Sequence, residues 1–165
     1  MGKYKISKRV GKPAYNLSKR TAKPHNIAVH YTGGTGSARN NVDYFRSGNR
    51  NASADFFIDD NSIWRFNPNV TKWYSWHIGD GHGKYGYSNA DTIGIEVVST
   101  GKKFTQAEKN RLRYLVRLLM RKYDIPANRV IRHYDASRKL CPYAYSGTTD
   151  KEKAWRELHE YITKE

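Results

Sequence analysis

Short apolar runs alternate with amphipathic stretches along this chain, and this alternation limits the folds that it can adopt. Apolar runs of about four to eight residues are typical of strands, whereas apolar residues at a period near 3.6 are typical of helices. Strands that alternate with helices predict an α/β fold, here a single domain with a mixed central β-sheet flanked by helices. The length of 165 residues agrees with one domain that spans residues 1–165.

The predicted helices have recognisable starting signals. Ser37 can cap a short helix. Thr105 and Glu108 form a capping box, and apolar residues follow them at helical spacing until Pro126 stops the element. Residues 150–165 place apolar side chains on one face and are predicted to form a C-terminal helix. The predicted strands are residues 27–31, 54–58, 63–66, 93–98 and 130–133, the second and third of which are joined by a hairpin turn.

Two segments lack a regular pattern. Residues 1–24 are basic and polar and contain proline breakers, so we expect an N-terminal arm or a lead-in of short strands. Residues 67–92 are rich in Gly, Trp, Tyr and His, and we expect a long irregular loop there. So long a loop in a small domain is usually functional. The aromatic residues Trp73, Tyr85 and Tyr87 in this segment either line a groove or belong to the core.

The charge of the chain favours an anionic partner. Thirty Lys and Arg residues stand against 15 Asp and Glu residues, a net charge of +15. Nucleic acid and a bacterial wall rich in anionic polymers both suit this charge, and general solubility is the plainer interpretation. We expect no nucleic acid, because the basic residues are dispersed and form no zinc-finger pair, RNA-binding signature or basic zipper. No stretch approaches the ~20 apolar residues of a membrane span.

Cys141 is the only cysteine, so it cannot form an internal disulfide, and it serves packing, metal binding or nucleophilic chemistry. His133 precedes it by eight positions, and His30 ends an apolar run far upstream. Two imidazoles and one thiolate are a suitable ligand set for zinc, and three protein ligands leave a fourth position open. A hydrogen-bonded core histidine and a buried apolar cysteine are the plainer interpretations of these residues.

Two charged residues suggest catalytic chemistry near these ligands. Glu96 interrupts an otherwise apolar predicted strand. Burial would raise the pKa of its carboxyl group and suit it to accept a proton from water, whereas an edge-strand position would leave it in solvent. Lys139 lies two residues before Cys141 and can stabilise an oxyanion there, or it is one more exposed cation.

Three segments resemble, in order and interval, the zinc-dependent N-acetylmuramoyl-L-alanine amidases. This family includes peptidoglycan recognition proteins and many phage endolysin catalytic domains. The segments are Ala-Val-His-Tyr-Thr at 28–32, Ile-Gly-Ile-Glu at 93–96, and Arg-His-Tyr-Asp at 132–135 with Lys-Leu-Cys-Pro at 139–142. The resemblance covers roughly residues 25–145, which would be the catalytic core, and the ordered set is more specific than any one motif.

The resemblance implies a zinc site with two catalytic residues beside it. Zinc would be held by His30, His133 and Cys141. Glu96 would be the general base or orient the water, and Lys139 would stabilise the tetrahedral intermediate. Some family members use a tyrosine just before the hairpin strand, but this chain has Ser-Ala-Asp at positions 53–55, which leaves more of the work to Glu96.

The resemblance also indicates residues that contact substrate. Trp76 and His77 resemble a tryptophan–histidine segment of the family, and Asn89 resembles a recurrent family position. With Tyr31, which follows the first predicted ligand, these residues are the expected substrate-binding group.

The expected function is therefore hydrolysis of the amide between N-acetylmuramic acid and L-alanine, as in a phage or prophage endolysin. The alternatives are a non-catalytic peptidoglycan-binding module, a cytoplasmic wall-recycling amidase, and a cysteine hydrolase with Cys141 as nucleophile. The first residues lack an apolar signal-peptide core, so we expect the protein to be made in the host cytoplasm and to act on the cell wall after release. We also expect a monomer. Its basic surface would attract anionic cell-wall polymers.

Overall fold

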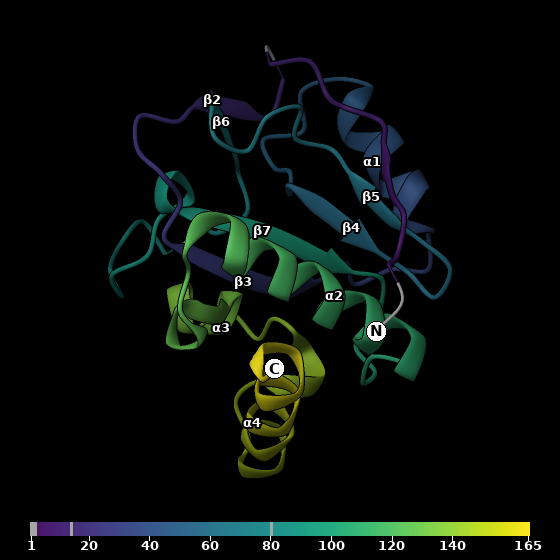
Figure 1. Ribbon diagram of the computed structural model, residues 1–165, viewed down its shortest axis with the longest axis vertical. Coiled ribbons are helices and arrows are strands. Elements are labelled where there is room, and N and C mark those ends of the chain that lie inside the picture. The colour runs from purple at the N-terminus through teal and green to yellow at the C-terminus, as the bar shows by residue number, and fades with distance from the viewer. Residues whose placement is uncertain (1–2, 14, 80) are drawn as a thin grey trace.

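The structure, a computed structural model, describes residues 3–13, 15–79 and 81–165. Within these residues a six-stranded sheet has the order β1-β5-β4-β7-β3-β8 (Figure 1). Its strands pair in parallel except for β4 and β5, which form the expected antiparallel hairpin. The prediction of a mixed central sheet is confirmed. The strands are β1 (Ile6–Lys8), β3 (Asn26–Tyr31), β4 (Phe56–Ile58), β5 (Ile63–Arg65), β7 (Thr92–Val97) and β8 (Val130–Arg132).

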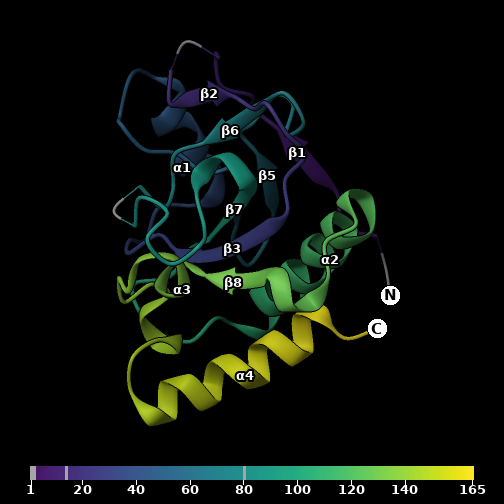
Figure 2. The same ribbon diagram turned by 90° about the vertical axis from the view of Figure 1, so that its left-hand side faces the viewer.

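The N-terminal segment packs against the domain through two short strands. β1 adds to the edge of the main sheet, and β2 (Leu17–Lys19) pairs with β6 (Trp73–Ser75) in a separate antiparallel ribbon (Figure 2). Arg20 is buried, and its Nε donates to the carbonyl of Val70 (2.8 Å). The expectation that residues 67–92 form one irregular loop is therefore wrong in part. The strand at 73–75 forms because its partner comes from the N-terminal segment, which a local pattern does not indicate.

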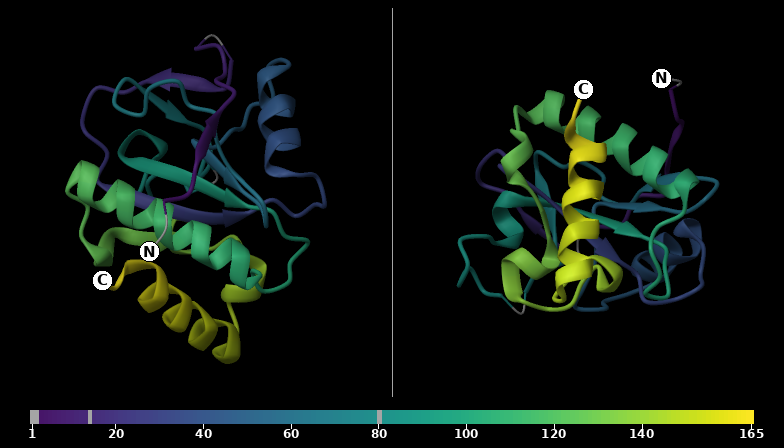
Figure 3. Two further views of the ribbon diagram at one scale, coloured as in Figure 1. Left: turned by 45° about the vertical axis from the view of Figure 1, so that its right-hand side comes forward. Right: turned by 90° about the horizontal axis from the view of Figure 1, so that it is seen from below.

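The helices begin where their capping residues predict. Ser37 caps α1 (Ala38–Arg46), with its side chain accepting from the N–H of Asn40 (3.1 Å). Thr105 and Glu108 form the capping box of α2 (Gln106–Tyr123). α4 (Thr149–Thr163) ends the domain. α2 and α4 cross on one side of the sheet, whereas α1 lies on the other (Figure 3).

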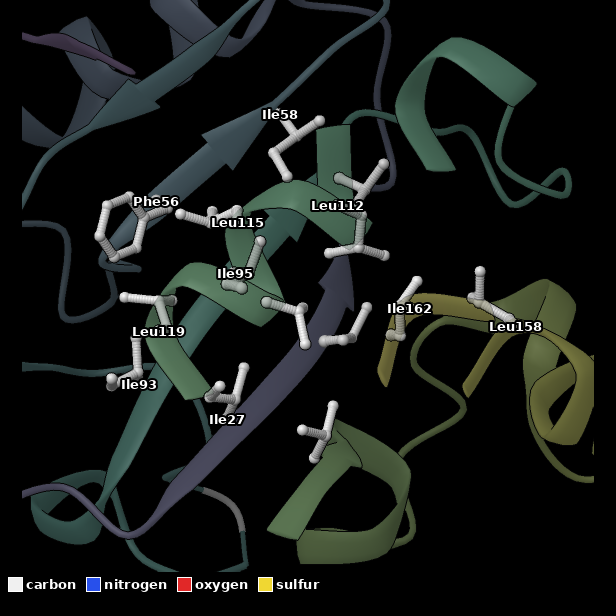
Figure 4. Packing of buried hydrophobic residues seen from close by; sticks show 14 of the residues in the cluster. Ile27, Phe56, Ile58, Ile93, Ile95, Leu112, Leu115, Leu119, Leu158 and Ile162 are labelled. Carbon is white, nitrogen blue, oxygen red and sulfur yellow. The ribbon is translucent and has the colours of Figure 1, made fainter. Parts of the chain in front are cut away.

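Strand alternation divides the core between the two faces of the sheet. Phe56 and Ile58 point to the face that α2 and α4 cover, while Phe57 between them points to α1. The larger cluster joins isoleucines of β3 and β7 to leucines of α2 (Figure 4). Each of these fully buried aliphatic side chains contributes about 1.5–3 kcal/mol of hydrophobic free energy. Both faces of the central strands are thus buried, which fixes β3 and β7 rigidly.

One predicted strand ends earlier than expected. β8 stops at Arg132, and His133 begins the short helix α3 (His133–Ser137) instead of ending the strand. The backbone N–H of Arg132 donates to Oδ2 of Asp135 (2.8 Å), a capping contact that turns the chain into the helix. Among the described residues, no helix is long and apolar enough to span a membrane.

Candidate metal centre and active site

Three parallel strands bring the predicted ligands to one edge of the sheet. β3 carries His30 and pairs with β7 on one side and β8 on the other. His133 directly follows β8. The chain then returns to the site, since the backbone N–H of Tyr134 donates to the carbonyl of Cys141 (3.0 Å). His30 and His133 are 103 positions apart, yet they share one buried site.

The three side chains fit a zinc ion. Their ligand atoms all lie within 4.8 Å of one another. Nδ1 of His30 is 3.1 Å from Nδ1 of His133 and 3.8 Å from Sγ of Cys141. Tetrahedral zinc, with bonds of about 2.0–2.1 Å to nitrogen and about 2.3 Å to sulfur, needs about 3.4 Å between nitrogens and about 3.6 Å from nitrogen to sulfur. The donor types and separations therefore match this metal.

A chain of hydrogen bonds fixes which nitrogen of His30 faces this cluster. Nε2 of His77 lies 3.3 Å from the carbonyl of Thr92, which can only accept, so Nε2 carries the proton. Burial lowers the pKa of His77 to about 3, so the ring is neutral and its Nδ1 accepts. That Nδ1 lies 2.9 Å from Nε2 of His30. His30 therefore donates through Nε2 and presents the lone pair of Nδ1 to His133 and Cys141.

The pKa of His30 is consistent with this tautomer. Burial holds it well below the usual range, and the neighbouring histidines and Lys139 lower it further. A neutral imidazole is the form that binds a metal. The supporting ring of His77 needs space as well, since a Cβ at Gly94 would lie 2.7 Å from it. Glycine at this position of β7 lets His77 reach His30.

Glu96 lies beside the ligands because β3 and β7 pair in register. Its partner across the strands is His30, and Oε1 lies 3.9 Å from Nδ1 of His30. Oε2 is buried without a hydrogen-bond partner among the described residues, although one fifth of the side chain is exposed. Burial raises the pKa of Glu96 to about 8, and the charge of Lys139 opposes this rise. A buried carboxyl oxygen left without a partner is costly, and a carboxyl group with a raised pKa is suited to exchange a proton.

Lys139 is exposed, two residues before Cys141. Its charge lowers the pKa of both Glu96 and His30. The loop that carries it is ordered by its own backbone, with the N–H of Lys139 donating to Oγ of Ser137 (3.2 Å) and the N–H of Cys141 donating to the carbonyl of Lys139 (2.7 Å). A cation near a carboxylate can meet negative charge that develops on a substrate oxygen.

The expected substrate-binding residues do not all lie together. Tyr31 is half-buried at the site, where burial first and then the nearby Cys141 raise its pKa. His77 lies beneath His30 and is buried, so it supports the ligand from behind. Oδ1 of Asn89 accepts from the N–H groups of His77 (2.9 Å) and Ile78 (2.8 Å), which holds this support in place.

Trp76 and Asn89 line a separate depression of about 300 Å³ whose lining contains none of the three ligands. Nε1 of Trp76 donates to Oγ of Ser18 (2.8 Å), which ties this depression to β2. Of the other aromatic residues in the segment, Trp73 packs against the cluster beneath α1, and Tyr87 packs near Ile131. The substrate role of Trp76 and Asn89 stays a prediction.

The sequence did not indicate how His77 and Asp55 act. Asp55 is buried, and its Oδ2 accepts from the N–H of Gly94 (2.7 Å) and from Oγ of Ser75 (2.8 Å). It therefore anchors β7, the strand that carries Glu96, to the strand beside it. The sequence singled out His77 because it follows Trp76, but its contact with His30 exists only in the folded chain.

The fold and this cluster define an α/β domain with two histidines and a cysteine that suit a zinc ion. The chain belongs to the N-acetylmuramoyl-L-alanine amidase family, whose model matches residues 20–144. The N-acetylmuramoyl-L-alanine amidase CwlA of Bacillus subtilis (strain 168) is 32% identical over 139 residues, which are 81% of this chain and 49% of that protein. The chain spans about half the length of the curated relatives that it matches.

Solved structures agree with this assignment. PlyL superimposes with a TM-score of 0.80 at 28% identity, covering 96% of this chain and 97% of that one. A mutant endolysin from Bacillus subtilis gives a TM-score of 0.80 at 25% identity, covering 97% of this chain and 99% of that one. The similarity therefore includes the N-terminal strands and α4, which lie outside the region that the family model matches.

Proposed function

We propose that this chain hydrolyses the amide bond between the lactyl group of N-acetylmuramic acid and L-alanine in bacterial peptidoglycan. The observation that carries the proposal is the buried cluster of His30, His133 and Cys141, with an oxygen of Glu96 at its edge that has no hydrogen-bond partner among the described residues. Membership of the amidase family supports the choice of bond.

The proposed cofactor is one zinc ion held by His30, His133 and Cys141. When bound, zinc acts as a Lewis acid that polarises a carbonyl group and makes water more acidic. The chain contributes a preformed ligand set, since the contact with His77 keeps Nδ1 of His30 unprotonated. Ligand rings held in this way need little rearrangement on binding.

Glu96 is the proposed general base. In its carboxylate form Glu96 can take a proton from the attacking water, and a pKa raised to about 8 lets it hold that proton until the leaving amine accepts it. Lys139 favours the carboxylate form that accepts the proton, because its charge lowers the pKa of Glu96. We propose that Lys139 also stabilises the negative charge that develops on the carbonyl oxygen of the substrate.

The cysteine-hydrolase alternative is less well supported. Cys141 is only 3% exposed. A nucleophile has to reach the substrate carbonyl, whereas a metal ligand does not. A binding-only module would have no use for the buried oxygen of Glu96.

The proposed setting is lysis of a cell wall by a phage or prophage endolysin. The resemblance of fold to an endolysin supports it, and the net charge of +15 would draw the domain to anionic wall polymers. Wall recycling inside the cell is the alternative setting. We propose that the protein works as a monomer.

Analysis of digested peptidoglycan tests the proposed bond directly. Purified walls treated with the protein should gain new N-terminal L-alanine without new reducing sugar ends. Glu96→Gln is the matched control, because it keeps the shape of the side chain and removes the base. New reducing ends would indicate a glycosidase, and the absence of both products would contradict a wall hydrolase.

A further inference from the structure

A cavity of about 520 Å³ is lined by residues of edge strand β8, of α3 and α4, and of the loop that precedes β7. None of its lining residues belongs to the metal cluster, and Glu96 and Lys139 do not reach it. The catalytic proposal leaves this cavity unused. Six of the residues that line it are Tyr85, Tyr87, Asn128, Arg138, Trp155 and Arg156.

The cavity carries a net positive charge. The one carboxylate among its described lining residues, Asp135, is paired with Arg132, which donates Nη2 to Oδ1 (2.9 Å) and Nε to Oδ2 (3.1 Å) and also pairs with Glu152 (2.8 Å). Arg138 and Arg156 are exposed, and no ion pair is formed by either of them within the described residues. Two guanidinium groups against one carboxylate that already has a partner favour an anionic ligand.

Arg138 is held in an unusual conformation. It ends α3 with a φ of 70°, a left-handed backbone that costs a non-glycine residue about 1 kcal/mol or more. Its guanidinium lies 4.2 Å from the ring of Tyr85, and Nη1 donates to the carbonyls of Tyr134 (2.9 Å) and Asp135 (3.0 Å). No hydrogen bond among the described residues uses Nε or Nη2, so these donors remain for a ligand.

The walls of the cavity suit a sugar better than an added peptide strand. Tyr85, Tyr87 and Trp155 offer ring faces, whose negative charge attracts the polarised C–H groups of a sugar. The free edge of β8 is closed to strand addition, since the N–H of Val130 bonds to Ala127 and the N–H of Arg132 bonds to Asp135. Ring faces with fixed guanidinium donors match a saccharide that bears an acid group.

We propose that this cavity is a second, non-catalytic binding site for glycan strands whose muramic acid carries a free carboxylate. The inference rests on the proposed function, because the amidase reaction makes that group. The C–N bond breaks, water gives its hydroxyl to the acyl carbon, and its hydrogen goes to the departing amine. Each turnover therefore adds one carboxylate to the strand, and the domain stays bound to the glycan that it has stripped.

Titration of the isotope-labelled chain followed by NMR tests this site. N-acetylmuramic acid should bind with a dissociation constant on the order of 1 mM. It should shift the amide signals of residues 85–87, 138 and 156–159. N-acetylglucosamine, which lacks the carboxylate, should bind at least about tenfold more weakly. Equal binding of the two sugars, shifts confined to the metal cluster, or no shifts at all would each overturn the proposal.

Two variants and a matched control locate the site. Arg156→Gln and Arg138→Asn should each weaken binding of N-acetylmuramic acid about tenfold, the loss of one charge-assisted hydrogen bond. Asparagine tolerates the left-handed backbone at position 138, and Arg156→Gln keeps the test valid if the other variant does not fold. Arg121→Gln on α2 removes an equally exposed charge and should change nothing. Equal affinity in all three variants would exclude the site.

Binding of the sugar in this cavity can be tested separately from the proposed hydrolysis. The sugar binds without turnover, and release of N-terminal L-alanine from a soluble muramoyl peptide is measured independently. Arg156→Gln should leave that release unchanged and should lower the fraction of protein retained on walls already stripped of peptide. A variant that loses hydrolysis of the soluble peptide instead would move Arg156 into the catalytic site and overturn the proposal.

Discussion

Nδ1 of His77 lies 2.9 Å from Nε2 of His30, and this contact sets the tautomer of the proposed zinc ligand. His77 in turn is fixed by the carbonyl of Thr92 (3.3 Å). Partners behind a metal ligand commonly change metal affinity by about 10–100-fold when they are removed. Removal of the His77 side chain should therefore lower the affinity for zinc, which can be measured without an assay of activity.

His77→Leu should weaken zinc binding by about 10–100-fold, because Nε2 of His30 loses its acceptor and the ring loses its fixed tautomer. His77→Asn keeps an acceptor at a similar distance from the backbone and should lose less. Competition with a chelator measures both affinities, and His25→Asn, an exposed histidine, is the control. Identical affinity in the Leu and Asn variants would leave His77 with a packing role only.

The purified chain should contain one zinc ion, and Cys141→Ala should lose most of it. The separations of 3.1 Å and 3.8 Å around Nδ1 of His30 are the basis, since they suit tetrahedral nitrogen and sulfur ligands. Metal analysis after dialysis measures the stoichiometry, and chelation should also lower the melting temperature, because zinc stabilises the folded state that binds it. A zinc content that Cys141→Ala leaves unchanged contradicts the ligand set.

Glu96→Gln should keep the fold and the zinc and lose activity by roughly a hundredfold or more. The amide cannot take a proton at neutral pH, although it has nearly the same shape. Turnover on a soluble muramoyl peptide and zinc content are measured on the same sample. Activity within a few-fold of the natural chain, with zinc present, would assign Glu96 a structural role.

Lys139→Ala should lower kcat by about 10²–10³-fold with little change in KM, because its charge meets an oxyanion that exists only in the transition state. Lys139→Arg should restore part of the loss, since a planar guanidinium does not replace a compact ammonium. Lys102→Ala, at another exposed position, is the control. An effect on KM alone would show that Lys139 binds substrate without stabilising the oxyanion.

The ion pair between Arg132 and Glu152 should make stability depend on acid pH. Burial alone would raise the pKa of Glu152, but hydrogen bonds from Nη1 of Arg132 (2.8 Å) and from the N–H of Gly147 (3.0 Å) outweigh it and hold the pKa below its usual value of 4.5. A lowered pKa in the folded state stabilises the protein above the unfolded pKa, and this contribution disappears as the pH falls through the folded value.

Glu152→Gln should therefore cost about 1–2 kcal/mol of unfolding free energy at neutral pH and much less in acid. Urea unfolding at two pH values measures the difference. Glu157→Gln is the matched control, because its contact with Lys153 is exposed and 4.0 Å long, and it should have little effect at either pH. A cost for Glu152→Gln that stays constant with pH contradicts the assigned role of the ion pair.

Local patterns predicted most of the fold. The capping signals at Ser37 and Thr105 mark the true starts of α1 and α2, and the apolar runs at 27–31 and 93–98 became β3 and β7. These features depend on neighbouring residues, so the order of residues along the chain determines them. β6 was missed because its partner β2 is more than fifty positions away.

The sequence by itself also determined the chemical groups of the site: one cysteine, a histidine after each of two apolar runs, and a carboxylate inside a third. The tertiary structure decided how they meet. The parallel register of β3 and β7 sets Glu96 opposite His30, the turn at Arg132 makes His133 the start of a helix, and burial places His77 behind His30. Such contacts depend on strand order and register, which arise from packing of the whole domain and are not encoded in any one segment.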